Sequence, residues 1–478
     1  MRLSELAYET IEPDPQIDGL TADSRAVSRG FLFAALPGVH ADGASYIPQA
    51  EENGAAAILA LPGVTSKLPV IVDAEPRRRL AQLAARFYPR QPEVVAGITG
   101  TNGKTSTARF AAQLWTLLGC EAGSIGTLGA QSRVYERALA HTTPDPVTLH
   151  ETMDAMTRAG VTHLAMEVSS HGLAQHRADG VHFRVAAFTN ITQDHLDYHP
   201  TFEDYFNAKG RLFTDLLASD GTAAINMDGE GAEAVVELAR LRGLPTVQTG
   251  WNGRDVKLLS CEPHMSGLAL ELECGGYVYR ADPPLIGAFQ AENALLAAGI
   301  VIAAGAKGAD VMMQLANIEG APGRMEFVAE IAGGGVYVDY AHTPDAVGTA
   351  LKAIRPHAPG RVIAILGAGG DRDRTKRPLM GAAAKANADI VMVTDDNPRT
   401  EDPASIRAEI LKGCPDAKEI GDRGEAIAAG VAMLDEGDVL LILGKGHEAG
   451  QQVGDQVFPF DDASVARDAV ADRMKELG

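Results

Sequence analysis

A glycine-rich stretch with a lysine and a threonine, GTNGKTS at residues 100–106, carries the groups needed to bind a chain of phosphates. It follows the apolar run EVVA and precedes ARFAAQLWTLLG, whose apolar spacing predicts a helix. In such a context the backbone N–H groups and the helix N-terminus bind phosphate oxygens, Lys104 adds positive charge and the Thr105 hydroxyl can ligate Mg²⁺. Ile98 stands where the usual first glycine would be, so Gly100 takes that role. An incidental glycine-rich turn is the alternative.

A second stretch, TDDNPRTEDP, ends an apolar run with two carboxylates and places an arginine three residues later. Two other apolar runs near the C-terminus also end in polar loops. Because strand ends lie together in a doubly wound sheet, Arg372, Asp396, Arg399 and Glu448 could surround one ligand. An arginine binds a carboxylate and the acids accept from an ammonium, which predicts a site for a free amino acid. The alternative is that Asp402 caps a helix and Arg399 pairs with a surface acid.

Three further polar residues lie where they could complete a metal site. The strand-like run THLAMEV delivers Glu167, and a carboxylate at a strand end beside a phosphate loop is a suitable second Mg²⁺ ligand next to Thr105. His195 follows another strand-like run, and Lys209 lies in a segment that we interpret as a helix. Taken alone, Lys209 would be a solvated lysine and His195 a polar residue with ordinary partners.

The elements that must position these residues alternate between strands and helices, which predicts an α/β fold. Pro89 and Pro92 bracket a linker in FYPRQP, and EGAPGRME interrupts the pattern again near residue 322. We therefore expect three domains: residues 1–89, residues 90–322 with a central P-loop ATPase-type parallel sheet, and residues 323–478 with a Rossmann-like doubly wound sheet.

The composition is that of a soluble enzyme. The 478 residues carry a net charge of −21, which disfavours binding to nucleic acid or to anionic lipid. The four cysteines have no CxxC spacing, so neither a zinc site nor a disulfide framework is indicated. No apolar run reaches the roughly 20 residues that a membrane span needs, and NALLAAGIVIAAGA is interpreted as a buried helix. We expect a cytoplasmic monomer.

The stretch GTNGKTS resembles the ATP loop of the Mur ligases and of their folylpolyglutamate synthase relatives, and the resemblance covers nearly the whole chain. It implies an ADP-forming amide ligase in which ATP phosphorylates a carboxylate and an amine attacks the acyl phosphate. The segments GAFQAENALLAA, PGRME and VDYAHTPD would join the loop around ATP, although Gln290 replaces the family's first asparagine. The ATP candidates are Gly100, Thr101, Asn102, Gly103, Lys104, Thr105, Ser106, Asn293, Arg324, Asp339 and His342.

The same resemblance implies two Mg²⁺ ions and makes Lys209 the family's carbamylated lysine. A free ammonium near Mg²⁺ would repel the ion, whereas a carbamate supplies an anionic oxygen. The implied metal ligands are Thr105, Glu167, His195 and the Lys209 carbamate, and the implied catalytic residues are Lys104, Glu167, His195 and Lys209.

The segments TADSR, HTTPDP and EVSSHGLAQHR resemble those that hold the acceptor in the Mur ligases that add the third amino acid. TTPDP is also an ordinary start of a helix, so each match alone is weak. The acceptor would be UDP-N-acetylmuramoyl-L-alanyl-D-glutamate, with Ser24 near the uridine diphosphate and Thr142, Thr143, Ser169, Gln175 and Arg177 along the muramoyl-dipeptide.

The stretches DNPR and GKGHE resemble the diaminopimelate-adding ligases and distinguish them from the lysine-adding ones. Lysine lacks the second carboxylate, so Arg399 would be desolvated without a partner, at a cost of roughly 1–3 kcal/mol or more. The candidates for binding meso-2,6-diaminopimelate are Arg372, Asp396, Asn397, Arg399, Gly444 and Glu448. Two alternatives are a folylpolyglutamate synthase-like ligase, which lacks the sugar-nucleotide segments, and a nucleotide-switched P-loop binding protein, which would form no adduct.

Overall fold

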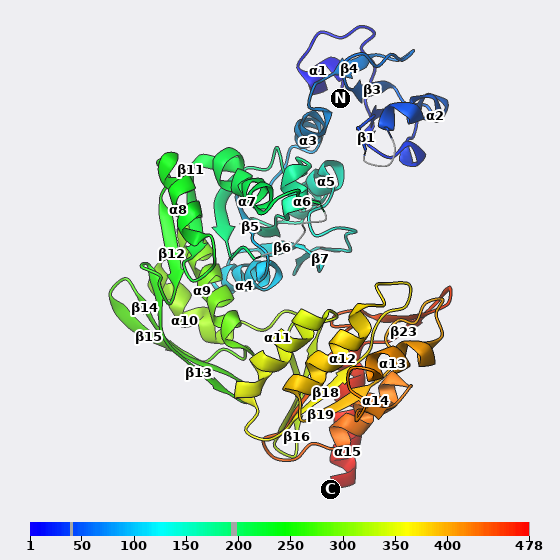
Figure 1. The fold of residues 1–478 in the computed structure, drawn as a ribbon. Helices are drawn as coiled ribbons and strands as arrows, with labels where there is room; N and C mark the ends of the chain where they lie inside the picture. Colours follow the sequence, from blue (N-terminus) through cyan, green and yellow to red (C-terminus); the bar gives the residue numbers. More distant parts are fainter. Residues whose placement is uncertain (39–41, 193–197, 478) are drawn as a thin grey trace. The chain divides into compact units, whose positions relative to one another are not determined.

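The structure is a computed structural model that describes residues 1–38, 42–192 and 198–477. It divides into two compact units, one of Met1–Val256 with Leu296–Val311 and one of Lys257–Leu295 with Met312–Gly478. Strands and helices alternate through both units (Figure 1), so the predicted α/β class is confirmed. No helix among the described residues is both long enough and apolar enough to cross a membrane.

The first ninety residues form a four-stranded parallel sheet in the order β1-β2-β3-β4. The elements are α1 Leu3–Ala7, β1 Gly19–Thr21, β2 Phe31–Ala34, α2 Ile47–Glu52, β3 Ala57–Ala60, β4 Val70–Val72 and α3 Pro76–Phe87.

The central part of the first unit is built on parallel strands in the order β12-β11-β10-β5-β9-β6, extended by antiparallel β7 and β8. Because β5, β9 and β10 are neighbours, the segments that follow them meet at the carboxyl edge of the sheet. The strands are β5 Val94–Thr99, β6 Ala122–Gly126, β7 Gly129–Ser132, β8 Glu136–Arg137, β9 His163–Glu167, β10 Phe183–Phe188, β11 Leu217–Asn226 and β12 Thr246–Gly250. The helices are α4 Lys104–Leu117, α5 Pro146–Arg158, α6 Ser170–Ala174, α7 Phe202–Arg211 and α8 Ala232–Leu241.

The second unit contains a six-stranded sheet in the order β16-β17-β21-β18-β19-β20, parallel except for the edge strand β16. Its strands are β16 Glu326–Ile331, β17 Gly334–Asp339, β18 Val362–Leu366, β19 Ile390–Val393, β20 Lys418–Glu419 and β21 Val439–Leu443. Helices α11, α12 and α13 cover one face and α14 and α15 the other (Figure 1), as in the predicted doubly wound sheet. These helices are α11 Pro344–Ile354, α12 Lys376–Asn387, α13 Pro403–Leu411, α14 Arg423–Ala432 and α15 Asp462–Leu477.

Successive residues of these central strands face opposite sides of the sheet, and helices cover both sides. Ala364 packs with the α11–α13 side, whereas its neighbours Ile363 and Ile365 pack with the α14–α15 side. Such strands are apolar on both faces, and that continuous run is the signal from which the sequence predicts them.

Strands β13 Val256–His264, β14 Gly267–Cys274 and β15 Tyr277–Ala281 precede α9 Ala288–Ala303, and β14 and β15 pair antiparallel. The helix confirms the interpretation of the apolar run near residue 300. The three strands were not predicted, because alternating polar residues such as Glu271 and Glu273 give them no continuous apolar run.

Candidate functional site

The phosphate-loop geometry predicted from the sequence is present. Strand β5 ends at Thr99 and α4 begins at Lys104, with a left-handed Gly103 (φ 83°) as its N-cap. At Gly100, with φ 149°, an added Cβ would lie 1.8 Å from Thr189 Oγ1. Both positions therefore require glycine, which an incidental turn would not explain.

The charged and hydroxyl groups of this loop lie at the start of α4. Lys104 Nζ donates to the carbonyls of Gly100 at 2.9 Å and Thr101 at 2.8 Å, so its ammonium lies over the loop. Thr101 and Asn102 are held by backbone N–H bonds to Asn190, at 2.9 and 3.1 Å. A helix N-terminus with a lysine folded over it is a concentration of positive potential suited to an anion.

Two oxygen donors for a cation meet beside the loop. Thr105 Oγ1 donates to Glu167 Oε2 at 2.9 Å, and Thr127 N donates to Glu167 Oε1 at 2.8 Å. Glu167 is buried at the end of β9. A hydroxyl and a carboxylate fit a hard cation such as Mg²⁺. His195, the third expected ligand, lies outside the described residues.

Lys209 is buried at the phosphate loop, so its interpretation as a solvated lysine is wrong. It is 2% exposed on α7, and its Nζ donates to Gly100 O at 2.8 Å. The same Nζ lies 4.4 Å from the ring centroid of Tyr205, whose hydroxyl is 3.0 Å from Thr101 Oγ1. The helix therefore places this ammonium against the phosphate loop.

The predicted acceptor residues of the central part form one connected set. Thr143 Oγ1 donates to the carbonyl of Glu167 at 3.0 Å. Arg177 donates to Thr143 O at 2.8 Å and, through Nη2, to Gln175 Oε1 at 2.8 Å. Ser169 Oγ accepts from Gly172 N at 3.0 Å and so caps α6. This chain of contacts leads from the candidate metal ligand to a guanidinium.

The remaining acceptor candidates have separate settings. Thr142 Oγ1 lies 3.1 Å from Thr127 Oγ1, next to the Glu167 carboxylate. Asp145 caps α5 through bonds from the backbone N–H groups of its first turn, so TTPDP does start a helix, as the alternative held. Ser24 lies in the four-stranded part, where its hydroxyl donates to Gln49 Oε1 at 2.8 Å.

The other nucleotide candidates belong to the second unit. Asp339, at the end of β17, accepts from Met325 N and Ala341 N at 2.8 Å each. Burial raises the pKa of its carboxyl, an effect that these two hydrogen bonds and the charge of Arg324 oppose. Asn293 donates to Gln290 Oε1 at 3.0 Å, so the glutamine that departs from the family pattern holds the asparagine.

An aromatic residue that the sequence did not single out, Tyr340, stands among these candidates. The Arg324 guanidinium lies 4.9 Å from its ring centroid, and the rings of His342 and His447 lie at 4.7 and 5.4 Å. Burial, and then the Glu448 carboxylate, raise the pKa of Tyr340. Its presence in the quoted segment VDYAHTPD was the available signal.

The amino-acid candidates after β19 and β21 meet as predicted. Asn397 Nδ2 donates to Glu448 Oε2 at 2.8 Å. Asn397 Oδ1 accepts from Lys445 Nζ at 3.2 Å and from Gln452 N at 2.8 Å. Two donors on the oxygen fix the orientation of this amide, so its N–H₂ group faces Glu448. Lys445, which the sequence analysis missed, is fully buried.

Asp396 lies against the start of the neighbouring loop. Its side chain is 8% exposed, and a Cβ added at Gly444 would lie 2.7 Å from Asp396 Oδ2. Gly444 has a φ of 117°, so a larger residue would be strained there and would also displace the carboxylate.

Arg399 and Arg372 come from the two loops beyond β19 and β18. Arg399 is left-handed (φ 52°), and its Nη1 donates to Gly370 O at 2.7 Å rather than to a surface acid. Arg372 lies on the same loop as Gly370 and is exposed. Asp402 accepts from Ser405 N and caps α13, so the helix cap of the alternative interpretation is confirmed.

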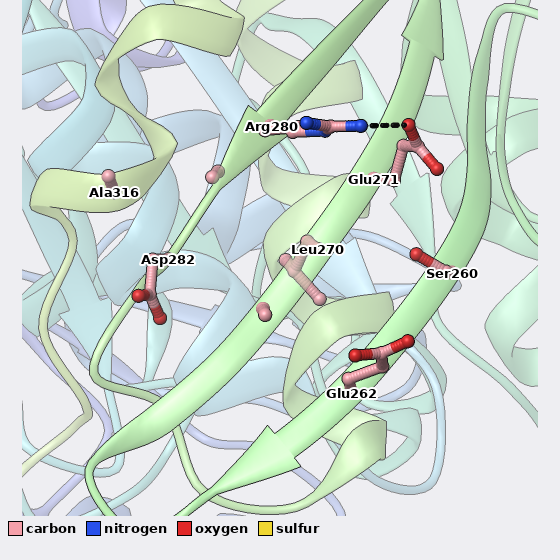
Figure 2. A pocket seen from close by; sticks show the side chains of 9 residues that line it. Ser260, Glu262, Leu270, Glu271, Arg280, Asp282 and Ala316 are labelled. Atoms are coloured by element: carbon pink, nitrogen blue, oxygen red, sulfur yellow. Dashed lines mark hydrogen bonds and ion pairs between the residues drawn. The ribbon is translucent and has the colours of Figure 1, made fainter.

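A separate cavity of about 540 Å³ lies against β13, β14 and β15 (Figure 2). Glu262, Glu271, Arg280 and Asp282 are among its lining residues, and Arg280 pairs with Glu271 at 3.3 Å. None of the predicted site residues lines it. We therefore assign the chemistry to the strand-end loops and not to this cavity.

Three family models match this chain in succession. They are "Mur ligase family, catalytic domain" over residues 16–88, "Mur ligase middle domain" over residues 98–301 and "Mur ligase, glutamate ligase domain" over residues 323–446.

Individual relatives match along the full length. The chain is 49% identical, over 98% of both chains, to a protein of Caulobacter vibrioides named UDP-N-acetylmuramoyl-L-alanyl-D-glutamate--2,6-diaminopimelate ligase. A protein of the same name from Agrobacterium fabrum is 46% identical over 96% of this chain and 94% of its own. A solved structure with that name in its title superposes with a TM-score of 0.76, at 31% identity and over 99% of both chains. A folylpolyglutamate synthase of Mycobacterium tuberculosis complexed with ADP shares the fold, with a TM-score of 0.60 at 20% identity, over 77% of this chain and 91% of its own.

Proposed function

This chain belongs to the Mur ligase family, and from that premise we propose that it is an ATP-dependent amide ligase of peptidoglycan synthesis. It adds meso-2,6-diaminopimelate to UDP-N-acetylmuramoyl-L-alanyl-D-glutamate. The observation that carries this function is the match, over 98% of both lengths, to a ligase with the same two substrates in its name. The folylpolyglutamate synthase relative is less similar, at 20% identity over 77% of the chain.

The phosphate loop of residues 100–106 binds the triphosphate of ATP in this proposal. Lys104 lies over the loop, within reach of phosphate oxygens once it leaves the Gly100 and Thr101 carbonyls. We propose that ATP is also bound by Asn293, Arg324, Asp339 and His342. Tyr340 offers a ring face to the Arg324 guanidinium.

We propose that one or two Mg²⁺ ions are bound by Thr105, Glu167, His195 and Lys209. When bound, Mg²⁺ neutralises charge on the phosphates during transfer. The contact between Thr105 and Glu167, at 2.9 Å, supports a shared cation site. Carbamylation of Lys209 by CO₂ would replace the buried ammonium with an anionic oxygen donor at Gly100, which fits the same site better than a second positive charge.

The reaction proceeds in two transfers. A D-glutamyl carboxylate oxygen attacks the γ-phosphorus of ATP, the bond to the β-phosphate oxygen breaks, and ADP leaves. The amine of diaminopimelate then attacks the acyl carbon, loses a proton and expels inorganic phosphate. Thr143 and Arg177 are proposed to hold the dipeptide near Glu167, since their contacts link the two.

We propose that selectivity for diaminopimelate comes from positively and negatively charged side chains in the loops at the strand ends. Asn397 donates to Glu448 Oε2 and so holds that carboxylate in place, and Asp396 and Glu448 accept from an ammonium. Arg399 binds the second carboxylate, which lysine lacks, and Arg372 adds charge from the neighbouring loop.

We further propose that the enzyme works as a cytoplasmic monomer of three domains, 1–89, 90–322 and 323–478. The three successive family-model matches, at residues 16–88, 98–301 and 323–446, support those boundaries. The negative net charge of −21 is consistent with small-molecule substrates rather than nucleic acid.

The test is phosphate release from ATP in the presence of UDP-N-acetylmuramoyl-L-alanyl-D-glutamate, comparing meso-diaminopimelate with L-lysine. We expect release with diaminopimelate and a product whose mass equals that of the amide. Equal turnover with lysine would contradict the role of Arg399. ATP hydrolysis that needs no amino acid and gives no adduct would support a nucleotide switch instead.

A further inference from the structure

Arg377, in the first turn of α12, has a fully buried guanidinium that joins two loops of the second unit. Its Nη2 donates to Glu401 Oε1 at 2.8 Å and to Gly369 O at 3.1 Å, and its Nη1 donates to Glu401 Oε2 at 3.0 Å and to Glu409 Oε2 at 2.8 Å. The paired bonds to Glu401 form a two-pronged contact, which restricts the carboxylate in orientation as well as in distance. Arginine is almost never fully buried unless its charge is paired, and four hydrogen bonds pair the Arg377 guanidinium here.

The two loops that Arg377 joins are those proposed to bind the amino acid. Gly369 lies in the loop after β18, and Glu401 lies two residues after Arg399 in the loop after β19. The Glu401 carboxylate also accepts from Asp371 N at 2.6 Å, so it binds both loops itself. The Arg377 bonds, together with that N–H, lower the pKa of Glu401 to about 2, which keeps it charged at any physiological pH.

The backbones of the two loops are in direct contact. Gly370 N donates to Asn397 O at 2.9 Å, and a Cβ added at Gly370 would lie 1.9 Å from Pro398 O. Thr400 Oγ1 donates to Asp371 Oδ1 at 2.7 Å. A shift of one loop must therefore displace the other.

At this contact two residues adopt a backbone conformation that side chains disfavour. Asp371 has a φ of 54° and Arg399 a φ of 52°. Such strain persists only where surrounding contacts determine the conformation. Glu401 binds Asp371 through the backbone and follows Arg399 closely in the chain, so the Arg377–Glu401 pair is placed to maintain both.

We propose that Arg377 is a positioning residue that, through Glu401, sets the direction of the Arg399 guanidinium and thereby the selectivity for an amino acid with a second carboxylate. The proposal rests on the proposed function, because it assigns Arg377 to the amino-acid site of that reaction. The guanidinium bonds of Arg377 go to Glu401, Glu409 and Gly369, which are groups of this chain.

A double-mutant cycle tests this dependence. The KM for meso-diaminopimelate is measured for Arg377→Met, for Arg399→Gly and for the double variant, with ATP and the nucleotide substrate saturating. We expect Arg377→Met to raise this KM roughly tenfold and to change the KM for ATP less than about twofold. In the Arg399→Gly background the same substitution should add less than about twofold, because the group that it positions is absent.

Two further variants and a control keep the result unambiguous. Glu401→Gln removes the negative charge that pairs with Arg377 but keeps a side chain of similar size. It should reproduce the KM effect if Arg377→Met folds poorly. Arg377→Lys retains the charge but not the two-pronged contact, so we expect partial rescue. Arg361→Met is a control for the loss of an arginine–carboxylate pair away from the site, since Arg361, which is 41% exposed, binds Asp438 Oδ2 at 3.0 Å near the opposite ends of the strands. It should lower Tm without raising the KM for diaminopimelate.

The outcomes separate the two proposals. Multiplicative effects of Arg377→Met and Arg399→Gly, or an unchanged KM in both Arg377→Met and Glu401→Gln, would overturn the positioning role while leaving the proposed function intact. Absence of diaminopimelate-dependent turnover in the unaltered enzyme would overturn the proposed function, and the positioning role with it.

Discussion

Replacing Arg399 by glycine removes the side chain that is proposed to bind the second carboxylate, without disturbing the loop that contains it. Arg399 has a φ of 52°, a conformation that glycine adopts without penalty and that costs other residues about 1 kcal/mol or more. Its guanidinium bond to Gly370 O is lost, but the side chain is half-buried and water can replace it. A hydrogen bond to a charged group contributes about 1.5–3 kcal/mol, which corresponds to a roughly 10- to 150-fold higher KM for diaminopimelate.

The assay is phosphate release at saturating ATP and nucleotide substrate, with the free energy of unfolding measured in urea for each variant. We expect the KM for ATP to stay within about twofold and stability to be unchanged or slightly higher. Arg399→Ala should raise the KM equally but be about 1 kcal/mol less stable than the glycine variant. An unchanged KM for diaminopimelate, or an equal rise in the KM for ATP, would refute the assignment.

Three other predictions concern the first unit. In Gly100→Ala the new Cβ would lie 1.8 Å from Thr189 Oγ1, so we expect ATP-dependent phosphate release to fall at least about tenfold; near-normal release would show that the loop tolerates a side chain. Chelation with EDTA should abolish turnover and added Mg²⁺ should restore it, which a phosphate-release assay checks directly. Burial lowers the pKa of His150 from 6.5 to about 4. The unfolded chain therefore binds a proton at His150 between these two pH values and the folded chain does not, so His150 costs stability as the pH falls through this window. Urea unfolding of the unaltered protein should lose up to about 3 kcal/mol more than His150→Gln between pH 6.5 and 4, and parallel curves would contradict this.

The parts of the fold that the sequence predicts are those with local signals. The strands β5, β18, β19 and β21 are continuous apolar runs, and each ends in a loop whose polar residues are adjacent in the chain. Because parallel strands bring their carboxyl ends to one edge, knowing the strands was enough to expect Asn397 and Glu448 near each other, and they are 2.8 Å apart.

The parts that the sequence does not predict depend on contacts between distant residues. Lys209 looks like a surface helix lysine, and its bond to Gly100, 109 positions away, has no local signal. Lys445 and Tyr340 lie inside motifs that were quoted, but only the fold reveals that one is fully buried and the other stands between charged side chains. Arg377 follows a run of exposed charges and is distinguished from them only by its burial.

The close approach of Gly370 to Pro398 has a consequence for how substrate choice can evolve. Because the two loops are in contact, neither can change its conformation unless the other changes as well. Mutations that adapt one loop to a different amino acid therefore require matching changes in the other. Chimeric enzymes that exchange a single loop between relatives of different selectivity should therefore be inactive or unstable, whereas exchange of residues 367–377 together with 394–409 would transfer the Arg377, Glu401 and Glu409 contacts as a set. The amino-acid preference of the enzyme is therefore expected to change only when both segments change together.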